Sequence, residues 1–363
     1  MKRLLTLLVV LSLFLPAAVR AVDFQEELQK LAQDNATGYI GPFATAFGTA
    51  MNSGLYNTAK VHGILGFDIG AKVSLLQVAD EDLTFDFLFP VIPFTVTNPG
   101  DNSSTTLDID LNQFYPNRAT STVFGSAKPD SLIADPTVTD GIIRNELSSK
   151  GWDPTDIDNF MSSAAGLQLV SDVNGRVPKV PGIPGIGLDF FPLVMPQASV
   201  GLPFQTEIMV RFIPEVDVPN IGKLSFLGLG VKHNLSQYIP VPMFPVNISG
   251  QFAWQQLDIG DVISSGHTAF NIEASKKLGI PGLSFTPYVG MGIESSTLDI
   301  SYTIANSGNP LLDGNTVAFD LKGDNSFRMT GGVRFQLTMI AISADYSMGK
   351  YNAASLGVGL SLR

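Results

Sequence analysis

The residues that could carry out catalysis are few in this sequence and lie far apart. The chain contains three histidines, His62, His233 and His267, and no cysteine. A hydrolase needs a nucleophile, a base and an orienting group within reach of one another. Ser264 and Ser265 come shortly before His267, but they fall in a predicted loop and no Gly-x-Ser-x-Gly motif surrounds them. We therefore predict that the protein is not an enzyme.

Residues that could bind a metal or a cofactor are equally sparse. The histidines have no ligand spacing, and the lack of cysteine excludes thiolate sites. The run Asp80–Asp82 could hold calcium through its carboxylates, but such a run is more typical of a solvated turn. Lys232 beside His233 is typical of a polar pair at a strand end. The sequence predicts no metal site and no cofactor.

Seven charged residues remain as candidates for a functional site. They occur in segments where apolar and polar residues alternate, and side chains on a strand point alternately to its two faces. We expect the seven to share the polar face and to point into a narrow lumen. They are Asp68, Lys72, Glu207, Arg211, Glu273, Arg334 and Asp345. Arg334 and Asp345 could pair across a hairpin, either as a structural ion pair or as a selectivity element.

The alternation is clearest at the C-terminus. Val333, Phe335, Leu337 and Met339 alternate with small or polar residues, and the runs 341–349 and 356–363 repeat the pattern. Three such segments in succession predict an antiparallel meander. Similar runs begin near residue 63 and return from about residue 198 onward. We count roughly 10 to 14 strands and favour about 12, within the range of membrane β-barrels.

The first 21 residues predict export from the cytoplasm. Lys2 and Arg3 precede an apolar core from Leu4 to Leu15, and small residues lead up to a cleavage site after Ala21. Removing this signal peptide also removes Arg20, so the net charge changes from −11 to −14. The mature chain has no basic cluster for phosphate contacts, and we expect no nucleic-acid partner.

The composition is compatible with two architectures, a membrane β-barrel and a soluble β-sandwich. Hydrophobic residues make up 45% of the chain and charged residues 15%, compared with about 25% charged in typical soluble domains. No run after the signal approaches the roughly 20 apolar residues of a membrane helix. The polar strand faces are rich in Gly, Ser, Thr, Asn and Gln, which suits a narrow lumen better than the water-facing side of a soluble β-sandwich. We predict an all-β fold, an antiparallel up-and-down transmembrane β-barrel in the bacterial outer membrane, with lipid as its partner.

The domain organisation follows from where the alternation is lost. Residues 22–58 predict an N-terminal helical plug or cap, because Phe24, Leu28 and Leu31 have helical spacing until a break at 33–38. Residues 59–363 form the barrel. Within it, 97–183 is a long polar insertion with a helix near 153–167 and candidate strands at 121–125 and 166–170.

Finer features of the strand region are also predicted. The stretches 260–267 and 306–325 read as polar loops. The apolar residues change parity near Ser295–Thr297, and this change predicts a β-bulge.

Three segments carry a resemblance to a known family. They are PQASVGL at Pro196–Leu202, VRFIP at Val210–Pro214 and GVKHNLSQYIP at Gly230–Pro240. They resemble an uncharacterised bacterial family known only as a domain of unknown function. The resemblance covers the chain from about Gly63 onward and implies an exported, barrel-like protein without a known activity.

A weaker architectural similarity is to the outer-membrane long-chain fatty-acid transporters, which have an N-terminal helical plug. Their Asn-Pro-Ala motif is absent here, so their substrate is not implied. The predicted function is to pass or bind a small hydrophobic or amphipathic molecule. The alternatives are a non-transporting structural or surface-interaction barrel and a soluble secreted β-protein. The oligomeric state is left open.

Overall fold

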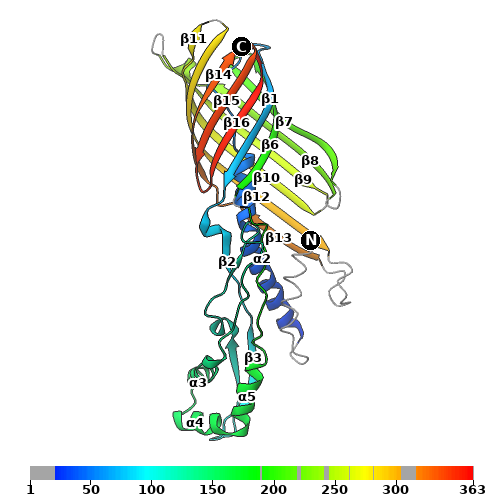
Figure 1. Ribbon diagram of the computed structural model, residues 1–363, viewed down its shortest axis with the longest axis vertical. Helices are drawn as coiled ribbons and strands as arrows, with labels where there is room; N and C mark the ends of the chain where they lie inside the picture. The colour runs from blue at the N-terminus through cyan, green and yellow to red at the C-terminus, as the bar shows by residue number, and fades with distance from the viewer. Residues whose placement is uncertain are drawn as a thin grey trace. The chain divides into compact units, whose positions relative to one another are not determined.

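The computed structural model describes residues 21–188, 190–218, 222–240, 245–260, 262–280, 282–303 and 316–362. Apart from Ala21, the predicted signal peptide lies outside these residues. The described chain divides into two compact units (Figure 1). The first contains residues 21–40 and 81–187, and the second contains residues 41–80 and 188–362. No helix in the described part of the chain is long and apolar enough to cross a membrane.

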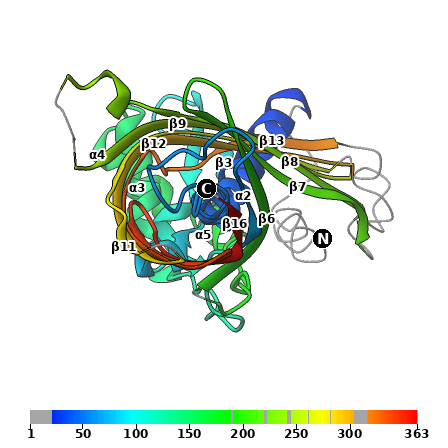
Figure 2. The ribbon, with the colours of Figure 1, turned by 90° about the horizontal axis from the view of Figure 1, so that it is seen from above.

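The second unit is a closed antiparallel β-barrel (Figure 2). Ten strands form the ring, which closes because β1 pairs with β16 and β10 pairs with β12. They are β1 (Phe67–Gln77), β6 (Phe190–Leu202), β7 (Thr206–Val218), β8 (Gly222–Asn234), β9 (Asn247–Ile259), β10 (Ile263–Ser275), β12 (Leu283–Thr303), β14 (Phe327–Leu337), β15 (Ile340–Met348) and β16 (Asn352–Leu362). The predicted antiparallel barrel is therefore confirmed as a fold.

Two further strands belong to the same sheet but lie outside the ring. They are β11 (Leu278–Ile280) and β13 (Thr316–Lys322), and both pair with β12. The described sheet has 12 strands, but the closed ring has ten of them and not the roughly 12 that we favoured for the barrel. The closed ring is at the lower end of the predicted range.

The barrel is apolar outside and mostly polar inside. Along β16, Leu356, Val358, Leu360 and Leu362 are each between 50% and 62% exposed, whereas Ser361, between the last two, is buried. Every strand of the ring carries large exposed hydrophobic side chains in this alternating pattern. The strands therefore do not pack their apolar faces against a second sheet, as a sandwich would.

Helix α2 (Ala21–Met51) is continuous, so the predicted break at 33–38 was wrong. Gly38 lies within the helix, and its missing side chain leaves room for the ring of Phe85: an added Cβ would lie 2.4 Å from Cδ2 of that ring. Pro42 lies inside the helix, close to the boundary between the two units. A proline there removes one backbone hydrogen bond. Residues 41–51 of α2 belong to the barrel unit.

Besides residues 21–40 of α2, the first unit combines two small two-stranded sheets with three helices. Strand β2 (Thr84–Asp86) pairs with β5 (Ala119–Ser121), and β3 (Val91–Thr97) pairs with β4 (Ser104–Asp110). The helices are α3 (Thr139–Ser149), α4 (Pro154–Ser162) and α5 (Ala164–Asn174). Four 3₁₀ helices complete the chain's described elements: η1 (Asp80–Leu83), η2 (Leu111–Phe114), η3 (Pro136–Val138) and, in the barrel unit, η4 (Ser236–Tyr238).

An aromatic core holds the first unit together. The rings of Phe89 and Tyr115 stack with centroids 3.8 Å apart, and Phe87 meets Phe89 edge-on at 4.9 Å. The Tyr115 hydroxyl donates a 2.6 Å hydrogen bond to the carbonyl of Pro178. Burial raises the pKa of Tyr115, so the hydroxyl stays a donor at physiological pH. This insertion is therefore a folded unit with its own core.

Several local predictions for the insertion were wrong. The single helix near 153–167 is two helices, because Ser163 ends α4 and caps α5 by accepting a hydrogen bond from the backbone N–H of Gly166. The candidate strand at 166–170 lies within α5, and α3 was not foreseen. Of the candidate strand at 121–125, only Ser121 belongs to β5.

In the barrel unit, two predicted irregularities are absent. The stretch 260–267 is not a loop, because β10 begins at Ile263. Strand β12 pairs with β10 without a register shift through Ser295–Thr297. The change of parity has another cause: Leu298 and Ile300 are buried on the inner face, which is apolar at that level.

A register shift does occur between Ile213 and Val216 of β7. Residues 306–315 of the second predicted loop lie outside the described chain, and β13 occupies 316–322.

Closure of the ring can be tested with one engineered disulfide in this cysteine-free chain. Ser74 of β1 and Ser355 of β16 are register partners, with hydroxyl oxygens 3.1 Å apart. The variant Ser74→Cys/Ser355→Cys should form an intramolecular disulfide, seen by mass spectrometry and by a reductant-sensitive gel shift. The control Ser74→Cys/Ser265→Cys joins β1 to the non-neighbouring β10 and should stay reduced. Equal oxidation of both variants would contradict the closed ring.

Candidate functional site

The interior of the barrel is filled by the chain itself. We call residues 41–62 the lumen segment. Its two ends are named by the connections there: the insertion end, where residues 78–189 join β1 to β6, and the turn end, where Thr338 and Met339 join β14 to β15. Near the insertion end, Thr45 accepts a hydrogen bond from the backbone N–H of Asp324. At the turn end, a ring nitrogen of His62 lies 3.5 Å from the Ser361 hydroxyl. The segment therefore runs the length of the barrel.

Two buried arginines hold the end of α2 inside the lumen. Arg211 of β7 donates to the carbonyls of Met51 (2.6 Å) and Ser53 (2.8 Å). Arg328 of β14 donates to the carbonyls of Thr49 (3.3 Å) and Asn52. The last carbonyls of a helix have no partner within the helix and carry its partial negative charge. Two cations are therefore well suited to bind them where water is excluded.

Each arginine is itself held by the barrel wall. The Arg211 Nε donates to Gln197 at 2.9 Å and its Nη1 to Gln255 at 3.2 Å. Arg328 pairs with Glu294 at 2.7 Å, and both side chains are almost fully buried. We call Arg211 and Arg328 the arginine clamp. Because a buried charge without partners costs several kcal/mol, these contacts fix both the arginines and the carbonyls that they bind.

A second ionic cluster fastens the lumen segment at the turn end. Glu207 accepts from the backbone N–H of His62 at 3.1 Å, and one of its oxygens lies 2.6 Å from the His62 ring. Its other oxygen lies 3.0 Å from the ammonium of Lys232. Lys232 also donates to the carbonyl of Thr58 at 3.4 Å. The carboxylate thus joins the wall to the segment.

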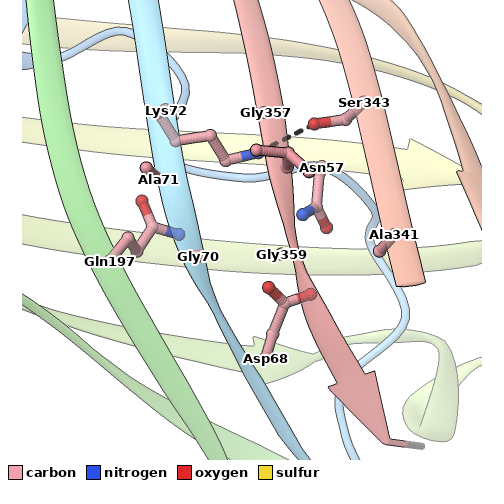
Figure 3. A pocket seen from close by; sticks show the side chains of 11 residues that line it. Asn57, Asp68, Gly70, Ala71, Lys72, Gln197, Ala341, Ser343, Gly357 and Gly359 are labelled. Carbon is pink, nitrogen blue, oxygen red and sulfur yellow. Dashed lines mark hydrogen bonds between the residues drawn. The ribbon is translucent and has the colours of Figure 1, made fainter. Parts of the chain in front are cut away.

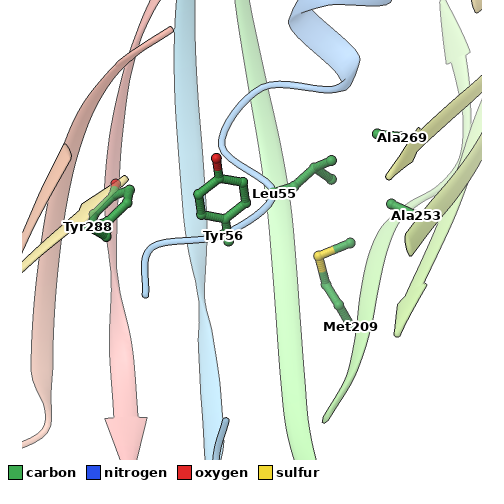
Figure 4. Packing of buried hydrophobic residues seen from close by; sticks show 6 residues of the cluster. All are labelled: Leu55, Tyr56, Met209, Ala253, Ala269 and Tyr288. Carbon is green, nitrogen blue, oxygen red and sulfur yellow. The ribbon is translucent and has the colours of Figure 1, made fainter. Parts of the chain in front are cut away.

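Between these clusters, the segment packs on small and aromatic wall residues (Figure 4). Leu55 and Tyr56 are buried against Met209, Ala253, Ala269 and Tyr288. The Tyr56 and Tyr288 rings meet edge-on with centroids 6.0 Å apart. Gly290 of β12 leaves room for this packing, because a Cβ there would lie 2.2 Å from the Tyr56 hydroxyl. The barrel wall is thus shaped for this segment.

One cavity beside the segment is small. A cavity of about 10 Å³ is lined by Asn57, Asp68, Lys72, Gln197 and Ser343, with glycines of β1 and β16 behind them (Figure 3). Such a volume holds about one water molecule. In this conformation the cavity is too small for an organic ligand.

A family model matches residues 1–362, nearly the whole chain. The chain belongs to a family of unknown function, DUF6588. This confirms the resemblance to an uncharacterised family. No curated protein matches the chain. The similarity to fatty-acid transporters stays a prediction, because neither the family nor the fold tests it.

The structure places the seven sequence-predicted residues on inward-facing positions of the barrel. Six are buried, and the side chain of Asp68 is 18% exposed. Their partners are as follows: Asp68 with Arg334 at 3.1 Å, Lys72 with Ser343 at 2.9 Å, Glu207 with His62 and Lys232, Arg211 with the end of α2, Glu273 with Ser249 at 2.8 Å, and Asp345 with Tyr288 at 2.9 Å. Arg334 therefore pairs with Asp68 rather than with Asp345, and also donates to Asn57 at 2.7 Å.

Sequence reasoning missed four interior residues that matter as much. These are Arg328, Glu294, Lys232 and His62. The first three were detectable, since they occupy the polar parity of their strands. With them, the described wall contributes five basic and five acidic interior side chains: Lys72, Arg211, Lys232, Arg328 and Arg334, and Asp68, Glu207, Glu273, Glu294 and Asp345. The charges of the interior balance.

The catalytic and metal candidates do not form a site that a substrate could reach. Ser265 and His267 are neighbours on the inner face of β10, with Oγ and Nε2 3.0 Å apart, but both are buried. The Ser265 hydroxyl is already bound to the carbonyl of Thr297 at 2.6 Å. His233 contacts Thr206 and Tyr238. Within the described ranges, no group of three metal-ligating side chains occurs.

The clamp predicts a large loss of stability on mutation. In Arg328→Met, Glu294 keeps a buried charge without its partner, and we expect the free energy of unfolding to fall by about 3–5 kcal/mol. The measurement is urea unfolding of the protein in detergent micelles, followed by circular dichroism. The control is Lys223→Met on β8, whose ion pair with Glu215 is exposed, and it should leave the unfolding midpoint unchanged. Equal effects of both substitutions would contradict the role of the clamp.

Proposed function

We propose that the protein is a bacterial outer-membrane β-barrel, exported by its N-terminal signal and closed at rest by its own lumen segment. The observation that carries the proposal is the apolar outer face of the ring. Soluble monomers rarely expose contiguous apolar patches larger than a few hundred Å², whereas here every strand of the ring exposes large hydrophobic side chains. Lipid is the partner that would cover such a face on all sides.

The strand lengths support the same proposal. A membrane-spanning strand needs about 9–11 residues. Strands β1, β14 and β16 each have 11 residues, and β15 has 9. A closed ring also satisfies the requirement that no strand edge faces lipid with unpaired backbone groups.

The filled lumen favours a barrel that does not conduct at rest. The arginine clamp and the Glu207 cluster fasten the lumen segment at two levels, and the cavity beside Asn57 holds about one water molecule. An open pore needs a water-filled lumen, as in porins. The lumen segment therefore acts as a plug, and a structural or surface-interaction role fits this state best.

Passage of a small hydrophobic or amphipathic molecule is the second candidate function. One observation favours it: the inner wall near the insertion end is apolar. Met195, Phe226 and Leu257 pack there against Phe47 and Met51 of the lumen segment. If the segment withdrew, it would leave an apolar site. Transport by this route requires the plug to move.

The proposal is tested by recording currents across planar bilayers. The wild-type barrel should show no steady conductance. Arg211→Ser/Arg328→Ser should conduct ions, because the carbonyls at the end of α2 lose the cations that hold them in the lumen. Heat-modifiable gel migration shows whether each variant still forms a closed barrel.

A disulfide provides the matched control. Thr58 of the lumen segment and Ser275 of β10 have hydroxyl oxygens 3.2 Å apart. Adding Thr58→Cys/Ser275→Cys to the conducting variant should abolish the current when oxidised and restore it on reduction. The wall pair Ser74→Cys/Ser355→Cys should have no such effect. Steady wild-type conductance would contradict the plug, and extraction of the protein from cells without detergent would contradict the membrane location.

A further inference from the structure

The two ends of the barrel differ in the length of their connections. At the turn end, residues 203–205 join β6 to β7, and Thr338 and Met339 join β14 to β15. At the insertion end, residues 78–189 join β1 to β6 and include the folded unit 81–187. The turn end also has the twelve-residue connection 235–246, and the insertion end also has short turns such as 349–351, but only the insertion end carries an entire folded unit.

The lumen segment begins at the insertion end of the barrel. The lumen segment passes from Thr45, near the insertion end, to His62, at the turn end, and only then does β1 begin. Strand β16 ends at the turn end, where Leu362 is the register partner of Phe67. The lumen segment therefore begins, with Gly41, toward the end of the barrel opposite to Leu362.

The inserted unit has the composition of a water-exposed module. Residues 81–187 contain fourteen acidic and six basic residues, which gives a net charge of −8. Its ion pairs are partly solvent-exposed, as in the contacts of Arg144 with Asp140 (2.8 Å) and Asp158 (2.6 Å). Such a unit belongs in water beyond the bilayer surface.

We infer that the insertion end faces the outside of the cell, so that the barrel displays the 81–187 unit and the N-terminal part of α2 at the cell surface. The inference rests on the proposed membrane location. Outer-membrane barrels have short periplasmic turns and longer extracellular loops. The lumen segment is then the route by which the N-terminal part of the mature chain crosses the outer membrane, inside its own barrel.

Single cysteines test this orientation, because the chain has no cysteine of its own. Three exposed positions are suitable: Ser103 in the inserted unit, Asn352 at the insertion end and Lys277 at the turn end. Each variant is expressed in a bacterium with an outer membrane and treated with a membrane-impermeant maleimide, before and after permeabilisation. Ser103→Cys and Asn352→Cys should react fully in intact cells, and Lys277→Cys only after permeabilisation. An epitope tag placed directly after Ala21 should bind antibody on intact cells.

The outcomes that would contradict this inference differ from those that would contradict the proposed function. Labelling of Lys277→Cys in intact cells, or protection of the other two variants with the protein in the membrane fraction, overturns the orientation alone. A tag that is reached only after permeabilisation overturns the route through the lumen. Recovery of the protein in the soluble fraction, without detergent, overturns the membrane location itself.

Discussion

The structure depends on the contact between two buried guanidinium groups and the carbonyl end of a helix. Arg211 and Arg328 reach the end of α2 from different strands, β7 and β14. Loss of the arginines would leave the carbonyls without a hydrogen-bond partner, because they have none within the helix. Loss of the carbonyls would leave the buried guanidinium groups without partners, and burying an unpaired charge is costly. This mutual need fixes where the helix stops inside the barrel. The same contacts hold the lumen segment in place, so that it forms part of the packed interior of the barrel.

The distribution of polarity follows from the same constraint. A ring of ten strands has an interior that side chains or a short chain segment must fill, and here polar main chain and paired charges fill it together with two apolar clusters. Apolar side chains are consequently left on the outside, where they need a partner other than water. The balanced interior charges and the apolar exterior are therefore two consequences of one arrangement.

Much of the barrel could be predicted from sequence because strand alternation is a local signal. Val333, Phe335 and Leu337 reveal the outer face of β14 without knowledge of any other strand. The partner of an inward residue is not local. Arg211 and Met51 are 160 residues apart in the chain, so the alternation showed that Arg211 points inward but not what it binds. The predicted pairing of Arg334 with Asp345 failed for this reason.

The helical regions were harder to predict from sequence, because tertiary contacts there override the local conformational preference of the residues. Gly38 reads as a helix break in the sequence, but it is the residue that lets Phe85 approach α2. Ser163 interrupts a run that reads as one helix, because its side chain caps the next one. Residues 298 and 300 carry apolar side chains on the inner face, so the change of parity reflected an apolar stretch of the interior and not a bulge.

The most direct measurement of the central claim is amide hydrogen exchange of the intact protein in detergent micelles. If the lumen segment is part of the interior, the amides of residues 49–62 exchange as slowly as those of β1 and β16, and they become exposed only when the whole barrel opens. Fast exchange of these amides, alongside slow exchange in the strands, would show that the segment is not held in the lumen and would contradict the account.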